Sequence, residues 1–299
     1  MEKLIITVTV DSSASYPGYK NMPPIDDTKT VAEEYIRAVN AGASLVHHHG
    51  VHYLEDKIQP DGRKLSKINF EGWKDLTDRI RDKVDAIIQY GIASARVEEK
   101  IKLMEQGPEM MSFCFNAHDE YFRPDPAYPP NELYAIHPRS ELEQFTKACL
   151  KYNVKPDCES FHTGAIWNFN YIKAQGLIKD PAWITMFLGW PGGAWTPPDV
   201  PSLVNFAQHV PAGVNWTLSV MDPATQWLLM PVAIALGGHV RVGWEDNPYM
   251  PDGSLSKTNA EQVEVAVQMA KVAGREVATA AEAREIMGLD PRPARVPMH

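Results

Sequence analysis

Residues 41–50 read AGASLVHHHG, and this stretch decides the fold that we predict. Its small residues and Gly42 suit the end of a helix and a turn, and the apolar residues that follow suit a buried strand. Successive side chains of a strand point to opposite faces, so His47 and His49 share one face and His48 takes the other. Two imidazoles held two residues apart on a rigid strand are a ready pair of metal ligands.

Short apolar segments of the same kind recur along the chain and alternate with helical patterns. We expect strands at 4–10, 44–49, 86–90, 111–115, 155–159, 184–188, 215–220 and 239–243. Continuous apolar runs suit parallel strands that are buried on both faces. Eight strands alternating with helices predict one (β/α)8 TIM barrel domain over residues 1–299, with a C-terminal helical extension. A doubly wound open sheet is the alternative.

Helix boundaries are also marked. A Ser or Thr followed three residues later by Glu is a capping-box pattern, and it occurs at Thr30, Ser140, Thr258 and Thr279. Gly42 and Gly288 stand where the C-caps of two helices are expected.

A second stretch, residues 239–247, reads HVRVGWEDN and suits a strand that runs into a loop. Its end carries Glu245 and Asp246. In a (β/α)8 barrel the carboxyl ends of all strands meet at one mouth, where catalysis takes place. Two His and one carboxylate around an open position are a catalytic metal set rather than a structural one. Taken alone, the acid pair also suits the N-terminus of a helix.

Other polar residues of these strands have less distinctive patterns. Glu159 ends the predicted fifth strand and reaches the same mouth, although by itself it suits a buried ion pair with Arg241. We interpret His48 and His52 as structural residues or as supports for the metal ligands. We interpret His239 as such a support rather than as a third imidazole ligand.

Two stretches rich in Pro and aromatic residues, 122–138 and 190–201, follow predicted strand ends. Pro at this density favours ordered, stiff loops, which in a barrel lie over the catalytic face. They are either plain surface loops or a substrate wall or subunit contact. The second stretch includes most of a glycine-rich turn whose backbone N–H groups suit an anionic cofactor. The residues of this turn are Gly189, Pro191, Gly192 and Gly193.

Composition excludes several classes of protein. The chain has 299 residues, 44% of them apolar, and its 29 basic and 38 acidic residues give a net charge of −9. No basic patch stands out, so we expect neither nucleic acid nor a membrane as a partner. Three cysteines without CxxC spacing argue against a disulfide framework and a cysteine-based zinc site. A reducing compartment suits them, and no signal core precedes the first strand, so we expect a cytoplasmic protein.

Together these motifs resemble those of the β-keto acid cleavage enzyme family over nearly the whole chain. The resemblance rests on AGAS at 41–44 before the histidines, on LGWPGG at 188–193 and on GGHVRVGWEDN at 237–247. It implies a (β/α)8 barrel, a catalytic Zn²⁺ and a homotetramer. It also implies a reversible Claisen-type exchange, in which a β-keto acid and acetyl-CoA become acetoacetate and a new acyl-CoA.

The resemblance also implies roles for individual residues. The implied zinc ligands are His47, His49 and Glu245. Asp246 is then the base, oriented by Arg241 and Glu159. The chemistry is sensible, because a metal with three protein ligands has room for the oxygens of a β-keto acid and stabilises an enolate. An adjacent cation lowers the pKa of an acid, so Arg241 is expected to keep Asp246 ionised and aimed.

The chain departs from the family in the substrate pocket. The family's founding enzyme has a Gly-Ala-Glu segment after strand one, whose Glu meets the substrate amine, whereas residues 12–15 here read SSAS. The usual Ser-Thr-Gly-Gly turn after strand three is replaced by YGIA at 90–93. Aromatic residues at strand ends and in loops suit neutral or ring-bearing acyl groups. They are Tyr90, Phe115, Phe161 and Trp190, with Tyr121, Tyr128 and Trp195. We therefore expect a β-keto acid that is not aminated.

Three other functions compete with this one. A metal-dependent aldolase or decarboxylase would act on a β-keto acid with the same metal but without CoA. An amidohydrolase-type hydrolase also uses an HxH strand, but there the pair lies on the first strand and further His ligands follow. A metal-binding scaffold has no need of the buried acid pair at Glu245 and Asp246.

Overall fold

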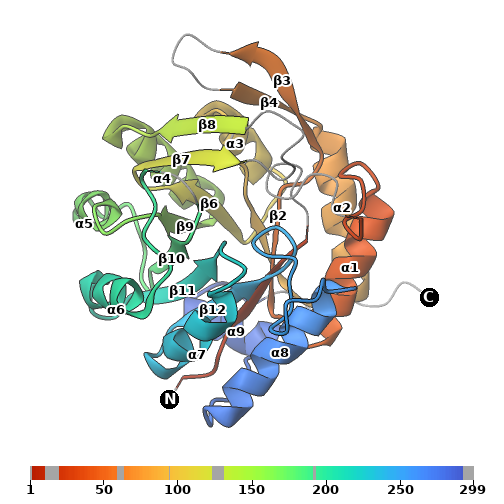
Figure 1. Cartoon of the computed structure of the whole chain (residues 1–299). Coiled ribbons are helices and arrows are strands. Elements are labelled where there is room, and N and C mark those ends of the chain that lie inside the picture. The colour runs from red at the N-terminus through yellow and green to blue at the C-terminus, as the bar shows by residue number, and fades with distance from the viewer. Residues whose placement is uncertain are drawn as a thin grey trace.

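Within the residues that the structure describes, eight parallel strands close into a barrel, with a helix after each strand (Figure 1). The computed structural model describes residues 2–10, 20–58, 64–93, 95–122, 131–190 and 193–291. The barrel strands are β1 (Ile6–Thr9), β2 (Leu45–His48), β5 (Ile87–Tyr90), β6 (Met110–Cys114), β9 (Lys155–Ser160), β10 (Trp183–Leu188), β11 (Asn215–Val220) and β12 (His239–Val242). Around the barrel their order is β1, β12, β11, β10, β9, β6, β5 and β2. The predicted (β/α)8 barrel is confirmed, and the open sheet is excluded.

The helices are α1 (Thr28–Asn40), α2 (Phe70–Lys83), α3 (Val97–Met104), α4 (Arg139–Tyr152), α5 (Ala165–Ala174), α6 (Val200–His209), α7 (Gln226–Ala235), α8 (Asn259–Val272) and α9 (Ala280–Met287). Thr258 and Thr279 are N-caps as predicted. Thr30 and Ser140 are not, since both lie inside their helices. Asp27 caps α1 instead, because its carboxylate accepts from the N–H and the hydroxyl of Thr30. None of the described helices combines the length and the apolar character of a membrane span.

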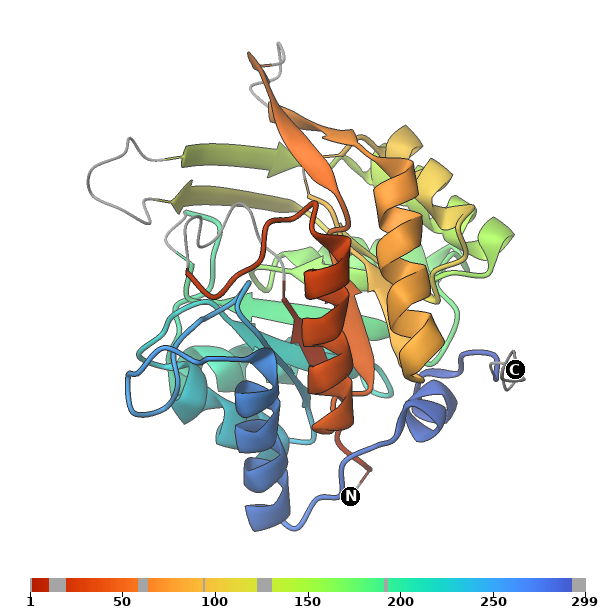
Figure 2. The same ribbon diagram turned by 90° about the vertical axis from the view of Figure 1, so that its right-hand side faces the viewer.

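Two β-hairpins leave the carboxyl end of the barrel, and the sequence patterns did not predict them. One pairs β3 (His52–Ile58) with β4 (Lys64–Ile68), and the other pairs β7 (Ala117–Phe122) with β8 (Asn131–Ile136). Figure 2 shows both hairpins projecting beyond the barrel. The prediction of a stiff loop over 122–138 is therefore wrong for residues 131–136, which form β8. Four of the five prolines of this stretch precede β8 and the fifth follows it, so none interrupts its pairing.

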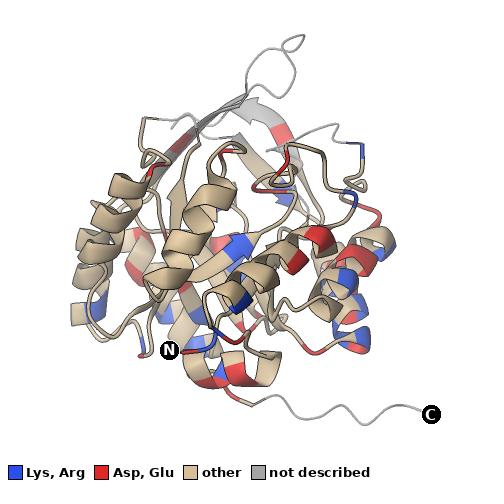
Figure 3. Ribbon diagram, turned by 60° about the horizontal axis from the view of Figure 1, so that its bottom comes forward, with Lys and Arg blue, Asp and Glu red and all other residues tan. Residues whose placement is uncertain are grey.

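Helix α9, the predicted C-terminal extension, closes the amino end of the barrel. Apolar side chains at the starts of the strands pack against it. This apolar cluster contains Ile5, Leu45, Ile87, Met110 and Trp183, with Ala278, Ala283 and Met287. Gly288 ends α9 in the left-handed conformation, with φ of 61°, as its C-cap position predicts. On the outer surface, acidic and basic residues are interspersed along the helices (Figure 3).

Candidate metal centre and active site

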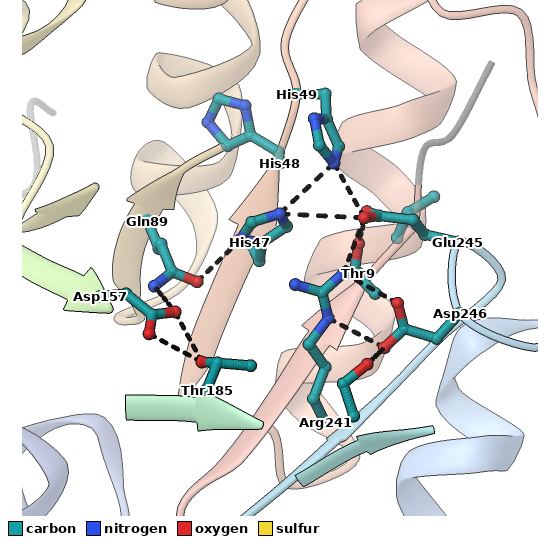
Figure 4. A network of polar contacts seen from close by, with 12 residues as sticks. Thr9, His47, His48, His49, Gln89, Asp157, Thr185, Arg241, Glu245 and Asp246 are labelled. Atoms are coloured by element: carbon teal, nitrogen blue, oxygen red, sulfur yellow. Dashed lines mark hydrogen bonds and ion pairs between the residues drawn. The ribbon is translucent and has the colours of Figure 1, made fainter. Parts of the chain in front are cut away.

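The predicted metal ligands converge at the carboxyl end of the barrel (Figure 4). His47 lies near the end of β2 and Glu245 follows β12, and these two strands flank β1. His49 Nε2 lies 3.4 Å from His47 Nε2 and 2.8 Å from Glu245 Oε1, and His47 Nε2 lies 3.9 Å from the same oxygen. Two imidazoles and one carboxylate so placed fit a single divalent metal ion.

The strand geometry of β2 separates the histidines as predicted. His47 points into the barrel, whereas His48 points outward and packs against the Trp73 ring, with a centroid distance of 5.3 Å. The chain turns after His49 at Gly50, which has a φ of 54°. A Cβ at Gly50 would lie 2.2 Å from the Trp73 ring, so only glycine fits at this turn.

Neighbouring groups prepare these side chains to bind a cation. Burial lowers the pKa of His47, and Arg241 adds to the effect, so the imidazole is neutral. Burial opposes ionisation of Glu245, yet the charges of His49 and Arg241 hold the pKa of this acid below its usual range. The Thr9 hydroxyl donates to the Glu245 carboxylate, and Arg241 Nη2 donates to its Oε1 at 2.6 Å. Neutral imidazole and ionised carboxylate are the forms that metal binding requires, so His47 and Glu245 already have the required form, and His49 would lose its proton on binding the ion.

Asp246 lies beside the metal ligands and is fully buried. Arg241 donates to both of its carboxylate oxygens, from Nε at 2.9 Å and from Nη2 at 2.8 Å, and Ser219 Oγ donates at 2.8 Å. Arg241 thus aims the carboxylate as expected. Burial, however, outweighs the charge of Arg241 and raises the pKa of Asp246 above its usual value. A raised pKa suits a general base that works near neutral pH.

Glu159 reaches the same mouth from β9. Burial raises the pKa of Glu159, while Arg241, Lys100 and a hydrogen bond from Ser112 oppose the rise. The charge of Glu159 in turn favours the charged form of Arg241. The structure therefore links Glu159 to Arg241, and its role in orienting Asp246 stays a prediction.

The glycine-rich turn after β10 is held by a carboxylate of the chain itself. The N–H groups of Gly193 and Ala194 donate to the two oxygens of Asp119, at 2.7 and 2.8 Å. Trp195 Nε1 donates to the carbonyl oxygen of Asp119 at 2.7 Å. Asp119 belongs to β7, so these bonds fasten the second hairpin to the turn. An anionic cofactor would have to displace Asp119 to use the N–H of Gly193.

The other residues of this turn are Gly189, Pro191 and Gly192. Gly189 has a φ of 90°, and a Cβ there would lie 2.8 Å from Asp222 and 2.9 Å from Pro198. Its glycine is therefore explained by close packing and conformation. Pro191 and Gly192, which we also assigned to cofactor binding, lie outside the described residues.

An aromatic cluster lies at the same end of the barrel. Its members are Phe161, Phe187, Trp190 and Trp195, with Cys114 and Met221. The Phe161 ring stacks on Phe187 at 4.7 Å, and Trp195 meets Phe161 edge-on at 4.5 Å. The Arg241 guanidinium lies over the Phe187 ring at 5.2 Å, which joins the cluster to the candidate site.

Not all of the predicted aromatic residues face the barrel mouth. Tyr90 and Phe115 belong to the layer between barrel and helices, because strand parity turns their side chains outward. Their assignment to a substrate wall is therefore wrong. The described part of the chain does not include Tyr128, residues 12–15 or the side chain of Tyr121.

His239 lies far from the metal ligands along its strand, and its interpretation as their support is wrong. It begins β12 at the amino end of the barrel, where its Nδ1 accepts from Ile5 N–H at 3.0 Å. Its ring stacks on Trp183, with a centroid distance of 5.0 Å. The error arises because His239 begins β12 whereas Glu245 follows its end, so the two residues lie at opposite ends of the barrel.

Several buried polar residues around the site were missed from the sequence. They are Thr9, Gln89, Asp157, Thr185 and Ser219. A signal was present, since each is a polar residue in a strand buried on both faces. Asp157 also shares strand parity with Glu159, which places both side chains inside the barrel.

Comparison with known proteins agrees with this geometry. Residues 3–289 match a family model described as beta-keto acid cleavage enzyme. The 3-keto-5-aminohexanoate cleavage enzyme of Fusobacterium nucleatum is 32% identical over 97% of this chain and 99% of that protein. The 3-dehydrocarnitine:acetyl-CoA trimethylamine transferase of Rhizobium meliloti is 28% identical over 97% of this chain and 98% of that protein.

Among solved structures, the ternary complex of ObcA with C4-CoA adduct and oxalate has a TM-score of 0.66. The match covers 88% of this chain and 66% of that chain, at 16% sequence identity. At this identity the likeness concerns the fold alone.

Proposed function

Because the chain belongs to the β-keto acid cleavage enzyme family, we propose that it catalyses a Claisen-type exchange between a β-keto acid and acetyl-CoA. The products are acetoacetate and a new acyl-CoA. One observation carries the proposal: the metal-ligand set at the barrel mouth lies directly beside a buried acid that a guanidinium aims. Asp246 and Glu245 share Arg241, which donates to both carboxylates. This pairing supports proton transfer at Asp246, beside the residues that would hold the metal.

We propose Zn²⁺ as the metal, held by His47, His49 and Glu245. Two imidazole nitrogens and one carboxylate oxygen are a common ligand set of catalytic zinc, with a position left for substrate. When bound, the ion supplies Lewis-acid polarisation of the substrate ketone. The neutral His47 and the ionised Glu245 support this assignment, since zinc needs both forms.

The residues around the metal ligands divide the remaining work. Asp246 accepts the proton whose loss starts the exchange. Arg241 and Ser219 hold its carboxylate in one orientation through three hydrogen bonds, so little reorganisation precedes proton transfer. After protonation of Asp246, Arg241 still pairs with Glu245, so the guanidinium charge stays compensated. The charge of Glu159, on β9, favours the charged form of Arg241.

The aromatic cluster supports a substrate without an amine. Its rings and the two sulfur-bearing side chains offer contact area to an apolar or ring-bearing acyl group, and the cluster contains no carboxylate that could form an ion pair with an ammonium group. A buried charge without a partner is costly. We therefore propose an uncharged or anionic β-keto acid.

We further propose a cytoplasmic homotetramer. The three cysteines of the chain, Cys114, Cys149 and Cys158, are buried and form no disulfide, as a reducing compartment permits. Trp167 on α5 and Leu228 on α7 are 76% and 61% exposed, and a subunit contact over these helices would bury them. Light scattering of the purified protein tests the subunit count.

The proposed reaction is tested with purified protein and a panel of β-keto acids, with and without acetyl-CoA. We expect acetoacetate and a matching acyl-CoA to form together, and no turnover without acetyl-CoA. Consumption of a β-keto acid at the same rate without acetyl-CoA would instead identify an aldolase or decarboxylase. Release of carbon dioxide distinguishes the decarboxylase.

A further inference from the structure

A buried chain of hydrogen bonds leads from His47 away from the metal ligands (Figure 4). His47 Nδ1 lies 2.7 Å from Gln89 Oε1, and Gln89 Nε2 donates to Asp157 Oδ2 at 2.8 Å. Thr185 Oγ1 lies within hydrogen-bond distance of both oxygens of Asp157, at 2.8 and 2.7 Å. All four side chains are at most 2% exposed, so water does not compete for these bonds.

The direction of each bond follows from the chemistry of Asp157. Burial and the nearby charge of Glu159 raise the pKa of Asp157 to about 7, whereas the hydrogen bonds from Thr185 and Gln89 favour its carboxylate form. A carboxylate only accepts hydrogen bonds, so Gln89 turns its NH2 group toward Asp157 and its oxygen toward His47, as the structure has it. An amide oxygen also only accepts, so the proton of the neutral His47 imidazole must sit on Nδ1. The lone pair of Nε2 then faces His49 and Glu245. A flipped Gln89 would meet His47 with its NH2 group and place the proton on Nε2.

We propose that Asp157 is a positioning residue, which acts through Gln89 to fix the tautomer and orientation of His47 for metal binding. The inference rests on the proposed metal centre. It explains why a carboxylate is buried in the barrel with a hydroxyl and an amide as its partners, since burial of such a group is otherwise costly. Ligating histidines commonly donate their second ring N–H in this way, and losing that partner typically costs about 10–100-fold in metal affinity.

The test measures zinc affinity of the full chain by competition with a chelator. We expect Asp157→Ala and Gln89→Met each to weaken Zn²⁺ binding by about 10–100-fold. The double variant Gln89→Glu/Asp157→Asn exchanges the acid and the amide. Its new carboxylate accepts from His47 Nδ1 and its new amide donates to that carboxylate, so affinity should return to within about threefold of wild type. Thr217→Val is the matched control, because the Thr217 hydroxyl is buried in the same barrel without a hydrogen-bond partner among the described residues.

Ring ¹⁵N chemical shifts of labelled histidine give a readout that a purely structural role would not change. In the metal-free protein we expect the His47 signal to report Nδ1–H in wild type and in the double variant. In Asp157→Ala we expect it to report a mixture of tautomers. Unchanged affinity and tautomer in a folded Asp157→Ala protein would overturn the inference, as would a double variant that folds but stays as weak as Asp157→Ala. If wild type itself binds no Zn²⁺, the proposed metal centre fails instead.

Discussion

The two ends of this barrel are built from the same strands and have opposite chemistry. Strand β2 places Leu45 in the apolar cluster under α9 and, two residues later on the same face, His47 among the proposed metal ligands. Strand β12 runs from His239, neutral and stacked on Trp183, to Arg241, which pairs with two carboxylates. The amino end thus stabilises the fold by packing, and the carboxyl end concentrates buried, paired charges around the candidate site.

This difference shows that the inward-facing residues of one strand can have two roles. Those near the amino end of the barrel pack the core, and those near the carboxyl end form the candidate site. Substitutions at the carboxyl end should therefore change catalysis with little effect on folding. Substitutions at the amino end should do the reverse. Each of the following predictions can break this division.

The largest effect is expected for Asp246→Asn at the carboxyl end. The amide keeps the shape of the side chain but cannot accept the proton, so kcat should fall by about 10²–10⁴-fold. Metal content should stay as in wild type, because Asp246 is not among the ligands. Steady-state kinetics and elemental analysis measure both quantities, and a rate within a few-fold of wild type would remove Asp246 from the role of base.

At the amino end, Leu45→Ala should lower the free energy of unfolding by about 2–5 kcal/mol, since it opens a cavity under α9. The metal site two residues away should keep its affinity, and kcat should stay within a few-fold of wild type. Urea unfolding and kinetics on the same preparation test this. Loss of metal from a folded Leu45→Ala protein would show that the two ends are not separable.

We expect the stability of the wild-type protein to depend on pH through His239 at the amino end. Burial lowers the pKa of His239 from 6.5 in the unfolded chain to about 3, so the unfolded state binds more protons between these values. Stability should therefore fall as the pH drops below 6.5, by about 2 kcal/mol from this group between pH 6.5 and 5. In His239→Asn the amide can still accept from Ile5 N–H but does not titrate. Unfolding of metal-free protein at both pH values should show a smaller loss in the variant, and equal losses would contradict the assignment.

The smallest effect concerns the substrate. We expect uncharged or anionic β-keto acids to exceed 3-keto-5-aminohexanoate by at least about tenfold in kcat/KM, roughly 1.4 kcal/mol. Trp195→Ala should reduce the preference, because it removes one wall of the aromatic cluster. A clear preference for the amino substrate in steady-state kinetics would overturn this account of the pocket.

Strand periodicity was sufficient to predict the barrel and the placement of His47, His48 and Glu245. It failed for His239 because parity gives the face of a strand but not which end of the barrel a residue occupies. The hairpin at 117–136 was missed because its pairing depends on a partner strand rather than on a buried apolar run.

The polar supports of the site were equally hidden. Gln89 and Asp157 belong to strands that are not sequential neighbours of each other, so only the closed barrel brings their side chains together. The hydrogen bonds from the glycine-rich turn to Asp119 were missed for the same reason, since a contact between residues 119 and 193 leaves no local pattern in the sequence.

The account depends most on one divalent metal at the carboxyl end, and its direct test is the metal content of purified wild type and His49→Ala. We expect about one zinc per chain in wild type. We expect almost none in His49→Ala, together with an unchanged circular dichroism spectrum and activity lower by at least about 10³-fold, since a Lewis acid contributes several kcal/mol to catalysis. Full zinc occupancy in His49→Ala, or an active wild-type enzyme that contains no metal, would contradict the central claim.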